Sequence, residues 1–363
     1  MAVYTTIDNP ELYFQVKLWE GEASSQGDGT TTALTFDGDE DMQPDMIWIK
    51  DRDASSWHDL TDSVRGVTKS IYPSETDAED TVATAVTTIG SDGFTVGSND
   101  QVNNGGNSFV AWCWKAGTTG SGTTTGSGTG KAYSYSVSTT AGFSIVKWLG
   151  NGSSGHTIPH HLGAVPQVVI MKNRDNAITW IVGHKSAAFT NILFLDAYTA
   201  ATDDNNAFAD TDPTSTVWTM GTGNGGNDND VNYVGYIFSE KQGYSKFGSY
   251  TGNSDNDGVF VYTGFKPAFI MTKASENTSG SNNWFIADNK RHSTGIGMNV
   301  IDRQLYANLN NADDTNSSID FLSNGFKWRR DGGDTNFSGR TFVYMAFAEA
   351  PFVNSKGVPC NAR

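Results

Sequence analysis

Basic side chains are scarce in this sequence of 363 residues. It contains 24 Lys and Arg against 40 Asp and Glu, which gives a formal net charge of −16. Nucleic-acid binding depends on clustered Lys and Arg side chains that neutralise backbone phosphates. We therefore expect no nucleic acid among the partners of this protein.

Long apolar runs and helical periodicity are missing as well. No apolar stretch approaches the roughly 20 residues of a membrane-spanning helix, and the opening residues MAVYTTIDNP do not follow the pattern of a secretory signal. The best helix candidate is a short segment at 72–86, where Ser74 could serve as an N-cap. We expect no membrane insertion and very little helix.

Cysteine is limited to two residues, Cys113 and Cys360. They do not form a C-x-x-C pair, which argues against a zinc site or dithiol redox chemistry. Cys113 lies within the apolar run FVAWCW, and a small thiol in such a run is expected to pack in the core. The sequence leaves open whether the two cysteines are bridged, and their number does not specify the compartment.

What the sequence does contain is a pattern that occurs three times. Each copy begins with a proline, continues with an apolar run and ends with a lysine six residues after the proline. The copies are PDMIWIK at 44–50, PQVVIMK at 166–172 and PAFIMTK at 267–273. Proline suits the first position of a strand, where no ladder donor is needed. Each copy therefore predicts a buried strand that ends at Lys50, Lys172 or Lys273.

Two further features recur in the same order. Upstream of each copy an aromatic residue precedes a glycine by two positions, as Trp19 precedes Gly21. Downstream, each copy closes with a strand of one design: FVAWCW at 109–114, YVGYIF at 233–238 and FVYMAF at 342–347. Both alternating faces of these closing strands are apolar. This indicates central strands covered on both sides, or strands covered by a neighbouring unit.

Short strands separated by turn signals are typical of β-sandwiches. We predict an all-β protein made of three tandem β-sandwich units of the lectin-like jelly-roll type. The predicted units comprise residues 1–117, with an N-terminal segment, 132–240, and 241–363, with a C-terminal tail. Residues 118–131 have the Gly, Ser and Thr content of a flexible linker between the first two units.

Five motifs carry a resemblance to a known family. They are WHDLTDSVRG at 57–66, FVAWCWKAG at 109–117, GFKPAFIMTK at 264–273, NGFKWRR at 324–330 and RTFVYMAFAEAPF at 340–352. The sequence resembles bacteriophage tail fibre and virion structural proteins with repeated concanavalin A-like sandwich units. The resemblance covers most of the chain and is weakest over 185–230. The second copy departs from the pattern, because it lacks the Asp-Gly-Phe or Asn-Gly-Phe turn of the other two.

The resemblance implies a structural protein of a virion appendage (tail fibre, tail tip or head decoration) that is assembled in the host cytoplasm. It implies lectin-like sandwiches that bind a host-surface glycan or receptor and neighbouring virion proteins. It also implies homo-oligomers, with a trimer expected. The family has no established catalytic residues to carry over, so no enzyme is expected. Two alternatives stay open: a glycan-degrading enzyme on the same scaffold, and a purely architectural virion protein with no host ligand.

Catalytic patterns are weak in the sequence itself. Alternating acids occur at Glu75, Asp77 and Glu79, but their neighbours lack the apolar residues of a strand beside a cleft. A solvated turn is therefore favoured over the carboxylate pair of a glycosidase. The histidine cluster HTIPHH at 156–161 is interrupted by proline and has no carboxylate nearby, which disfavours a metal site.

Three tryptophans are the candidate ligand-binding residues. Trp57, Trp180 and Trp284 recur downstream of the repeated lysines. Exposed aromatic side chains stack on sugar rings, but an aromatic at a repeated position is more often part of a core. Both interpretations are kept as hypotheses.

Ion pairs are predicted close to two of these tryptophans. Arg65 follows Asp62, and Arg291 follows Asp288, each on the same turn of chain. If exposed, such pairs contribute little to stability.

One loop resembles a calcium site. Asn253, Asp255 and Asp257 in NSDNDG match the first half of a calcium-binding loop. The twelfth position of that loop is Gly264, where an EF-hand has a glutamate, so an EF-hand is excluded. A structural Ca²⁺ at a sandwich edge is the remaining metal candidate, and no other cofactor is expected.

Overall fold

A computed structural model describes residues 4–276, 282–292, 300–316 and 318–360. In this part of the chain the protein is all-β, as predicted, and its helices are short turns. They are η1 (Pro10–Leu12), α1 (Asp100–Asn103), η2 (Lys185–Ala187) and α2 (Asn205–Phe208). None of these helices is long and apolar enough to cross a membrane.

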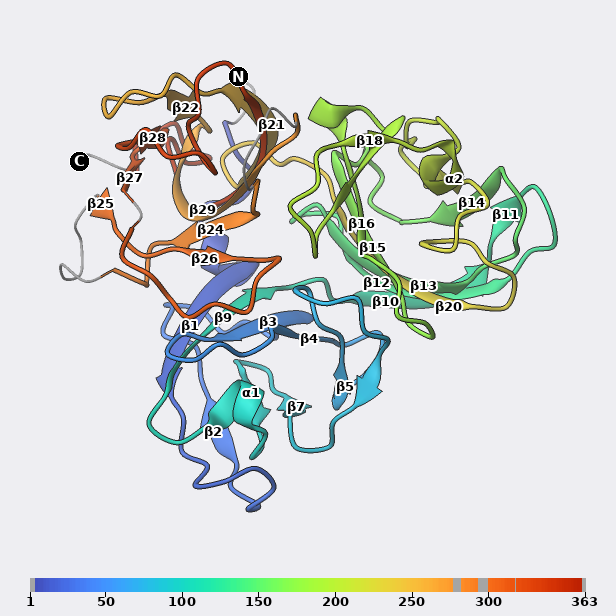
Figure 1. Ribbon diagram of the computed structural model, residues 1–363, viewed down its shortest axis with the longest axis horizontal. Helices are drawn as coiled ribbons and strands as arrows, with labels where there is room; N and C mark the ends of the chain where they lie inside the picture. Colours follow the sequence, from blue (N-terminus) through green and yellow to red (C-terminus); the bar gives the residue numbers. More distant parts are fainter. Residues whose placement is uncertain (1–3, 277–281, 293–299, 317, 361–363) are drawn as a thin grey trace.

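The strands form sheets in three groups, and each group comes from one continuous stretch of the chain (Figure 1). We call these groups the first, second and third lobes; they comprise strands β1–β9, β10–β20 and β21–β29. Each lobe pairs a larger sheet with a smaller one, and apolar side chains from both sheets fill the space between them. Each lobe is therefore a β-sandwich.

In the first lobe the larger sheet has the order β1-β9-β3-β4 and the smaller sheet the order β2-β8-β7. A two-stranded ribbon, β5-β6, accompanies them. The strands are β1 (Phe14–Glu20), β2 (Thr32–Leu34), β3 (Met46–Asp51), β4 (Asp59–Asp62), β5 (Lys69–Ser70), β6 (Asp80–Thr81), β7 (Val86–Ile89), β8 (Phe94–Val96) and β9 (Ser108–Trp114).

The second lobe has an eight-stranded sheet of order β10-β12-β13-β20-β15-β16-β17-β18 and a smaller sheet of order β11-β14-β19. The strands are β10 (Thr118–Thr123), β11 (Thr125–Gly126), β12 (Ala132–Ser138), β13 (Phe143–Leu149), β14 (His156–Pro159), β15 (Val168–Asn173), β16 (Ile181–His184), β17 (Asn191–Phe194), β18 (Thr202–Asp203), β19 (Val217–Met220) and β20 (Asn232–Phe238).

The third lobe has a five-stranded sheet of order β21-β29-β23-β24-β26 and a four-stranded outer sheet of order β22-β28-β27-β25. The strands are β21 (Ser245–Thr251), β22 (Phe260–Tyr262), β23 (Phe265–Ala274), β24 (Phe285–Asp288), β25 (Val300–Ile301), β26 (Leu305–Tyr306), β27 (Ile319–Leu322), β28 (Gly325–Trp328) and β29 (Thr341–Pro351).

The closing strands predicted from the sequence correspond to β9, β20 and β29, and each lies inside the larger sheet of its lobe. Alternate residues of a strand face in opposite directions. One face of each closing strand enters a single apolar cluster that all three lobes share, which we call the central core. The closing strands contribute Val110, Trp112, Trp114, Val234, Tyr236, Phe238, Val343, Met345 and Phe347 to it.

The opposite faces of these strands enter the separate cores of the sandwiches. Cys113 does so in the first lobe, Ile237 in the second and Ala346 in the third. The double apolar pattern therefore arises because each closing strand is covered by its own smaller sheet on one side and by the other lobes on the other side. Cys113 is buried, as expected, and Cys360 is exposed; both are free thiols, which answers the question that the sequence left open.

Residues 118–131 have the composition of a linker, but they contain two strands of the second lobe. β10 is the edge strand of the eight-stranded sheet, paired with β12, and β11 pairs with β14 of the smaller sheet. Glycine suits β10 because the rings of two tyrosines of β12 occupy the space where its Cβ atoms would lie. The second lobe therefore begins at β10 rather than at residue 132.

Candidate functional site

Two of the three predicted sugar-stacking residues are buried. Trp180 and Trp284 are 0% and 1% exposed and lie in the central core. Their indole Nε1–H groups donate to the carbonyl oxygens of Tyr72 and Phe194, each in the preceding lobe, at 3.0 and 2.7 Å. These tryptophans therefore hold neighbouring lobes together, and no face of either ring is free to stack on a sugar.

Trp57 does not occupy the position equivalent to Trp180 and Trp284. Those two residues directly precede β16 and β24, and the residue that directly precedes β4 is His58. His58 Nε2 lies 3.1 Å from the carbonyl oxygen of Tyr306 in the third lobe. Burial lowers the pKa of His58, so a neutral imidazole N–H takes the place of the indole N–H. In the first lobe the equivalent of Trp180 and Trp284 is therefore His58, and the expectation that Trp57 recurs at this position is wrong by one residue.

The three repeated lysines are buried, and two of them donate to a carbonyl oxygen of the preceding lobe. All three side chains are fully buried, and each lysine is the penultimate residue of its strand: Lys50 in β3, Lys172 in β15 and Lys273 in β23. Lys172 donates to the carbonyl oxygen of Thr76 in the first lobe at 2.8 Å, and Lys273 to that of Ala197 in the second lobe at 3.0 Å. Burial lowers the pKa values of the three ammonium groups to about 8, about 8 and about 7, in chain order. Lys172 and Lys273 thus mark contacts at the joints between lobes, whereas Lys50 donates to the carbonyl oxygens of Asp51 and Ala54 within its own lobe.

The two predicted ion pairs are present, and both are buried. Arg65 pairs with Asp62 and Arg291 with Asp288, all four with side chains 0% exposed. Each aspartate also accepts a hydrogen bond from a closing strand of another lobe. Asp62 accepts from the hydroxyl of Tyr236 at 2.7 Å, and Asp288 accepts from the indole of a tryptophan in β9 at 2.9 Å. Because a buried charge that loses its partner is costly, these groups fix how the lobes meet.

The candidate calcium loop is exposed, and its oxygens have partners within the protein. The side chain of Asn253 accepts from the backbone N–H of Asp255 at 3.1 Å. Asp257 pairs with Lys327 at 2.7 Å and Arg329 at 3.0 Å, and the hydrogen bond from Lys327 lowers the pKa of Asp257. The described residues contain no group of three His, Cys, Asp or Glu side chains that could hold a metal ion. The loop forms turns and an ion-pair network, with no convergent set of ligands.

The alternating acids Glu75, Asp77 and Glu79 differ in their surroundings. Asp77 is exposed, whereas Glu79 receives two hydrogen bonds of 2.8 Å from the guanidinium group of Arg174 in the second lobe. The backbone N–H of Glu79 also donates to the carbonyl of Arg174 at 2.9 Å. The helix considered for 72–86 is absent, because this segment runs as turns and extended chain along the second lobe.

The histidine cluster at 156–161 is divided between separate surroundings. His156 is buried, and its ring nitrogens lie 2.8 Å from Asn227 and 2.6 Å from Thr124. His161 is half-buried and stacks on Tyr135 with ring centroids 3.8 Å apart. The two rings therefore serve different local contacts.

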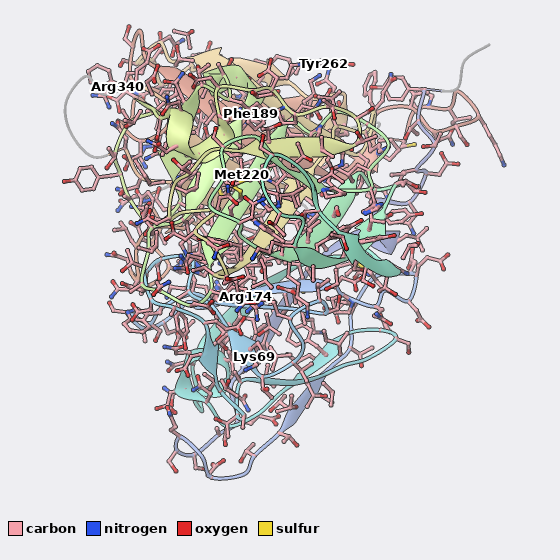
Figure 2. All side chains as sticks on the ribbon, turned by 90° about the vertical axis from the view of Figure 1, so that its right-hand side faces the viewer. Lys69, Arg174, Phe189, Met220, Tyr262 and Arg340 are labelled. Atoms are coloured by element: carbon pink, nitrogen blue, oxygen red, sulfur yellow. The ribbon has the colours of Figure 1, made fainter. Side chains whose placement is uncertain are left out.

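Exposed aromatic side chains gather on the outer sheet of the third lobe. Phe260 and Tyr262 in β22 are 43% and 54% exposed, while Val261 between them enters the core. Figure 1 shows β22 and β28 on the outer side of this lobe, and Figure 2 shows Tyr262 near the upper edge of the molecule. The hydroxyl of Tyr4 donates to the carbonyl of Gly264 at 2.8 Å and lies 3.4 Å from that of Tyr262. We call Tyr4, Phe260 and Tyr262 the aromatic face.

The ring of Phe260 rests on the backbone of the neighbouring strand. A Cβ atom at Gly325 in β28 would lie 3.0 Å from two carbons of this ring, so the glycine allows the close approach. Lys327 is the cross-strand partner of Phe260 and joins an ion-pair network through Asp257. A ring supported on one side and exposed on the other, with charged donors and acceptors beside it, can stack on a sugar ring and bind its hydroxyl groups.

The corresponding strands of the other lobes carry no such face in the part of the chain that the structure describes. In the first lobe β2 exposes Ala33, and in the second lobe β14 presents Thr157 and Pro159 and has its outer edge covered by β11. The aromatic face is thus a departure from the repeat. Phe260 and Tyr262 lie outside the repeated aromatic positions, so the repeat pattern does not point to them. The available signal was the alternation Phe-Val-Tyr at 260–262, which is apolar on both faces of an outer strand.

One comparison with known proteins finds a match, and it covers most of the chain. A protein-family model described as a domain of unknown function, DUF7483, matches residues 9–351. No curated protein and no solved structure matches the chain. The matched range runs from just before η1 to the end of β29, so it contains all three lobes.

Proposed function

This chain belongs to the family described as a domain of unknown function, DUF7483, and we propose that it is a structural protein of a bacteriophage virion appendage that binds a host-surface glycan through its aromatic face. The observation that carries the binding role is the ring of Phe260, supported by Gly325 and open to solvent. The assignment to a virion rests on the resemblance of the five sequence motifs to tail fibre and virion proteins.

The construction of the molecule supports a scaffold role. The three sandwiches share one central core, and buried polar contacts connect each lobe to its neighbours. A body joined in this way holds the outer sheet of the third lobe in a fixed orientation relative to the other two lobes. Rigid presentation of a binding face lowers the entropy lost on binding.

The proposal is tested by glycan binding with paired variants. Surface polysaccharides purified from bacterial strains that adsorb the phage are immobilised, and binding of the whole protein is measured. We expect the double variant Phe260→Ala/Tyr262→Ala to bind at least about tenfold more weakly, because stacking of one aromatic ring contributes about 1 kcal/mol and two are removed. Tyr198→Ala is the matched control, since Tyr198 is 61% exposed but lies in the second lobe.

Three results would contradict the proposal. Absence of saturable binding to any host polysaccharide would favour a purely architectural role. Equal loss of binding in the Tyr198→Ala control would show that the aromatic face is not the site. Release of new reducing ends from the polysaccharide would instead favour the glycan-degrading enzyme.

A further inference from the structure

A second surface is created by the length of the eight-stranded sheet. The larger sheets of the first and third lobes have four and five strands, whereas β10 and β12 extend the sheet of the second lobe beyond β13. Ile145 of β13 lies in the central core, and Lys147, two residues further along the same face, is only half-buried. This face of the eight-stranded sheet is therefore apolar where the other lobes cover it and polar beyond the covered region.

This uncovered end of the sheet forms a groove of about 350 Å³. Its lining comes from the ends of neighbouring strands, where Ser134 pairs with Lys147 and Leu149 pairs with Asn232. Arg174, just after β15, completes it, and Figure 2 shows this residue near the boundary between the second and first lobes. A groove of this volume falls within the range of small-ligand sites.

The groove presents unused hydrogen-bonding groups. Within the described residues, the ammonium group of Lys147 and the hydroxyl of Ser134 have no hydrogen-bond or ion-pair partner. Arg174 binds Glu79 through Nε and Nη2, which leaves Nη1 for another acceptor. The amide nitrogen of Asn232 is bound to a neighbouring aspartate at 3.0 Å, which leaves its oxygen as an acceptor.

We propose that this groove binds an acidic saccharide, with the sugar carboxylate on Lys147 and Arg174. Charge-assisted hydrogen bonds to a carboxylate are about twice as strong as neutral ones. Ser134 and the amide oxygen of Asn232 are then placed for sugar hydroxyls, and Leu149 offers an apolar contact to the ring.

The test uses the whole protein and two defined probes, a galacturonic acid trisaccharide and the neutral galactose trisaccharide of the same linkage. Isothermal titration calorimetry should show saturable binding of the acidic probe and at least tenfold weaker binding of the neutral one. Lys147→Ala should weaken binding of the acidic probe at least tenfold, and Lys147→Arg should retain it. Lys246→Ala is the control, because Lys246 is a half-exposed lysine in the third lobe.

The outcomes separate this site from the aromatic face. The Phe260→Ala/Tyr262→Ala variant should bind the acidic trisaccharide with the affinity of the unaltered protein. This holds whether or not the variant has lost its binding to the host polysaccharide. Equal affinity for both probes, or no change with Lys147→Ala, would overturn the proposal. Displacement of the trisaccharide by equimolar inorganic phosphate would also overturn it, since that result identifies an anion site that does not recognise sugar.

Discussion

The buried lysines show how single residues join the lobes. Lys172 and Lys273 each donate to one carbonyl of their own lobe, at 2.6 Å, and to one of the neighbouring lobe. Removing an ammonium group from water is costly, and hydrogen bonds offset only part of that cost. Burial is accordingly the main cause of their lowered pKa values.

The lowered lysine pKa values predict that stability rises with pH above neutrality. In the unfolded chain each lysine holds its proton up to its ordinary pKa of 10.5, whereas folded Lys273 releases it near pH 7. The unfolded state then binds more protons, so the free energy of unfolding increases with pH. Between pH 7 and 9 we expect Lys273 to contribute an increase of about 2 kcal/mol, measured by urea denaturation at both pH values.

The variant Lys273→Met isolates this effect. It should be less stable at both pH values, because the carbonyls of Ala197 and Asn282 lose their donor, but its increase from pH 7 to 9 should be smaller by about 2 kcal/mol. Lys246→Met, at a half-exposed position, should keep the full increase. An unchanged increase in Lys273→Met would contradict the prediction.

At the scale of elements, β1, β13 and β21 each pair with the closing strand of their lobe, and the three strands end in the same way. A Cβ atom at Gly21, Gly150 or Gly252 would lie 2.1, 2.2 or 2.3 Å from a backbone carbonyl oxygen of a crossing loop. The glycine in the repeated aromatic and glycine pattern is therefore required by close backbone approach. It allows the loop to cross the strand end directly.

A buried asparagine completes this construction in each lobe. Asn103, Asn227 and Asn336 are 0% exposed, and each accepts a backbone N–H from the residue that follows the glycine, at 3.0, 3.0 and 3.1 Å. The glycines are visible in the repeated sequence pattern, whereas these asparagines are not. A glycine after a strand is a recognisable sequence signal. By contrast, the sequence of a polar loop does not show which of its asparagines is buried in the folded protein.

The glycine construction makes a stability prediction. Gly150→Ala should destabilise the protein by at least about 2 kcal/mol, because its Cβ meets the carbonyl of Asp228 and the backbone must move. Gly333→Ala is the control, since no atom lies within 4 Å of a Cβ at that exposed position. Urea denaturation measures both variants. Equal stability of the two would show that the crossing loop adjusts without cost.

At the scale of the whole molecule, the central core makes the three sandwiches interdependent. Trp112 of the first lobe lies in that core, donates to Asp288 at 2.9 Å and packs against Phe269, both in the third lobe. An isolated lobe would expose its share of this apolar cluster to water. The homotrimer implied by the family resemblance stays a prediction, and the central core is already closed within one chain.

The shared core predicts a single unfolding transition. Trp112→Ala should lower the free energy of unfolding by about 3–5 kcal/mol, and differential scanning calorimetry should show one transition shifted as a whole. Amide exchange in the second lobe should accelerate together with that in the first. A second transition that remains at the original temperature would mean that the lobes unfold independently.

The sequence was sufficient for the fold class, the apolar closing strands and the pairs Asp62–Arg65 and Asp288–Arg291. These features depend on the alternation of apolar residues, on turn residues and on short spacings. All of these are properties of residues that lie close together in the sequence. The Gly, Ser and Thr content of 118–131 does not reveal strand β10, because the hydrogen bonds that hold this strand come from the neighbouring strand β12.

The packing of distant segments decided which apolar and charged side chains are buried and which are exposed. For Trp180 and Trp284 the sequence favoured core packing but left sugar stacking open, and the adjoining lobes cover both side chains. The same packing left Phe260 and Lys147 uncovered at the outer margins of their sheets. Burial depends on contacts between residues far apart in the chain, so no local pattern distinguishes a buried aromatic from an exposed one.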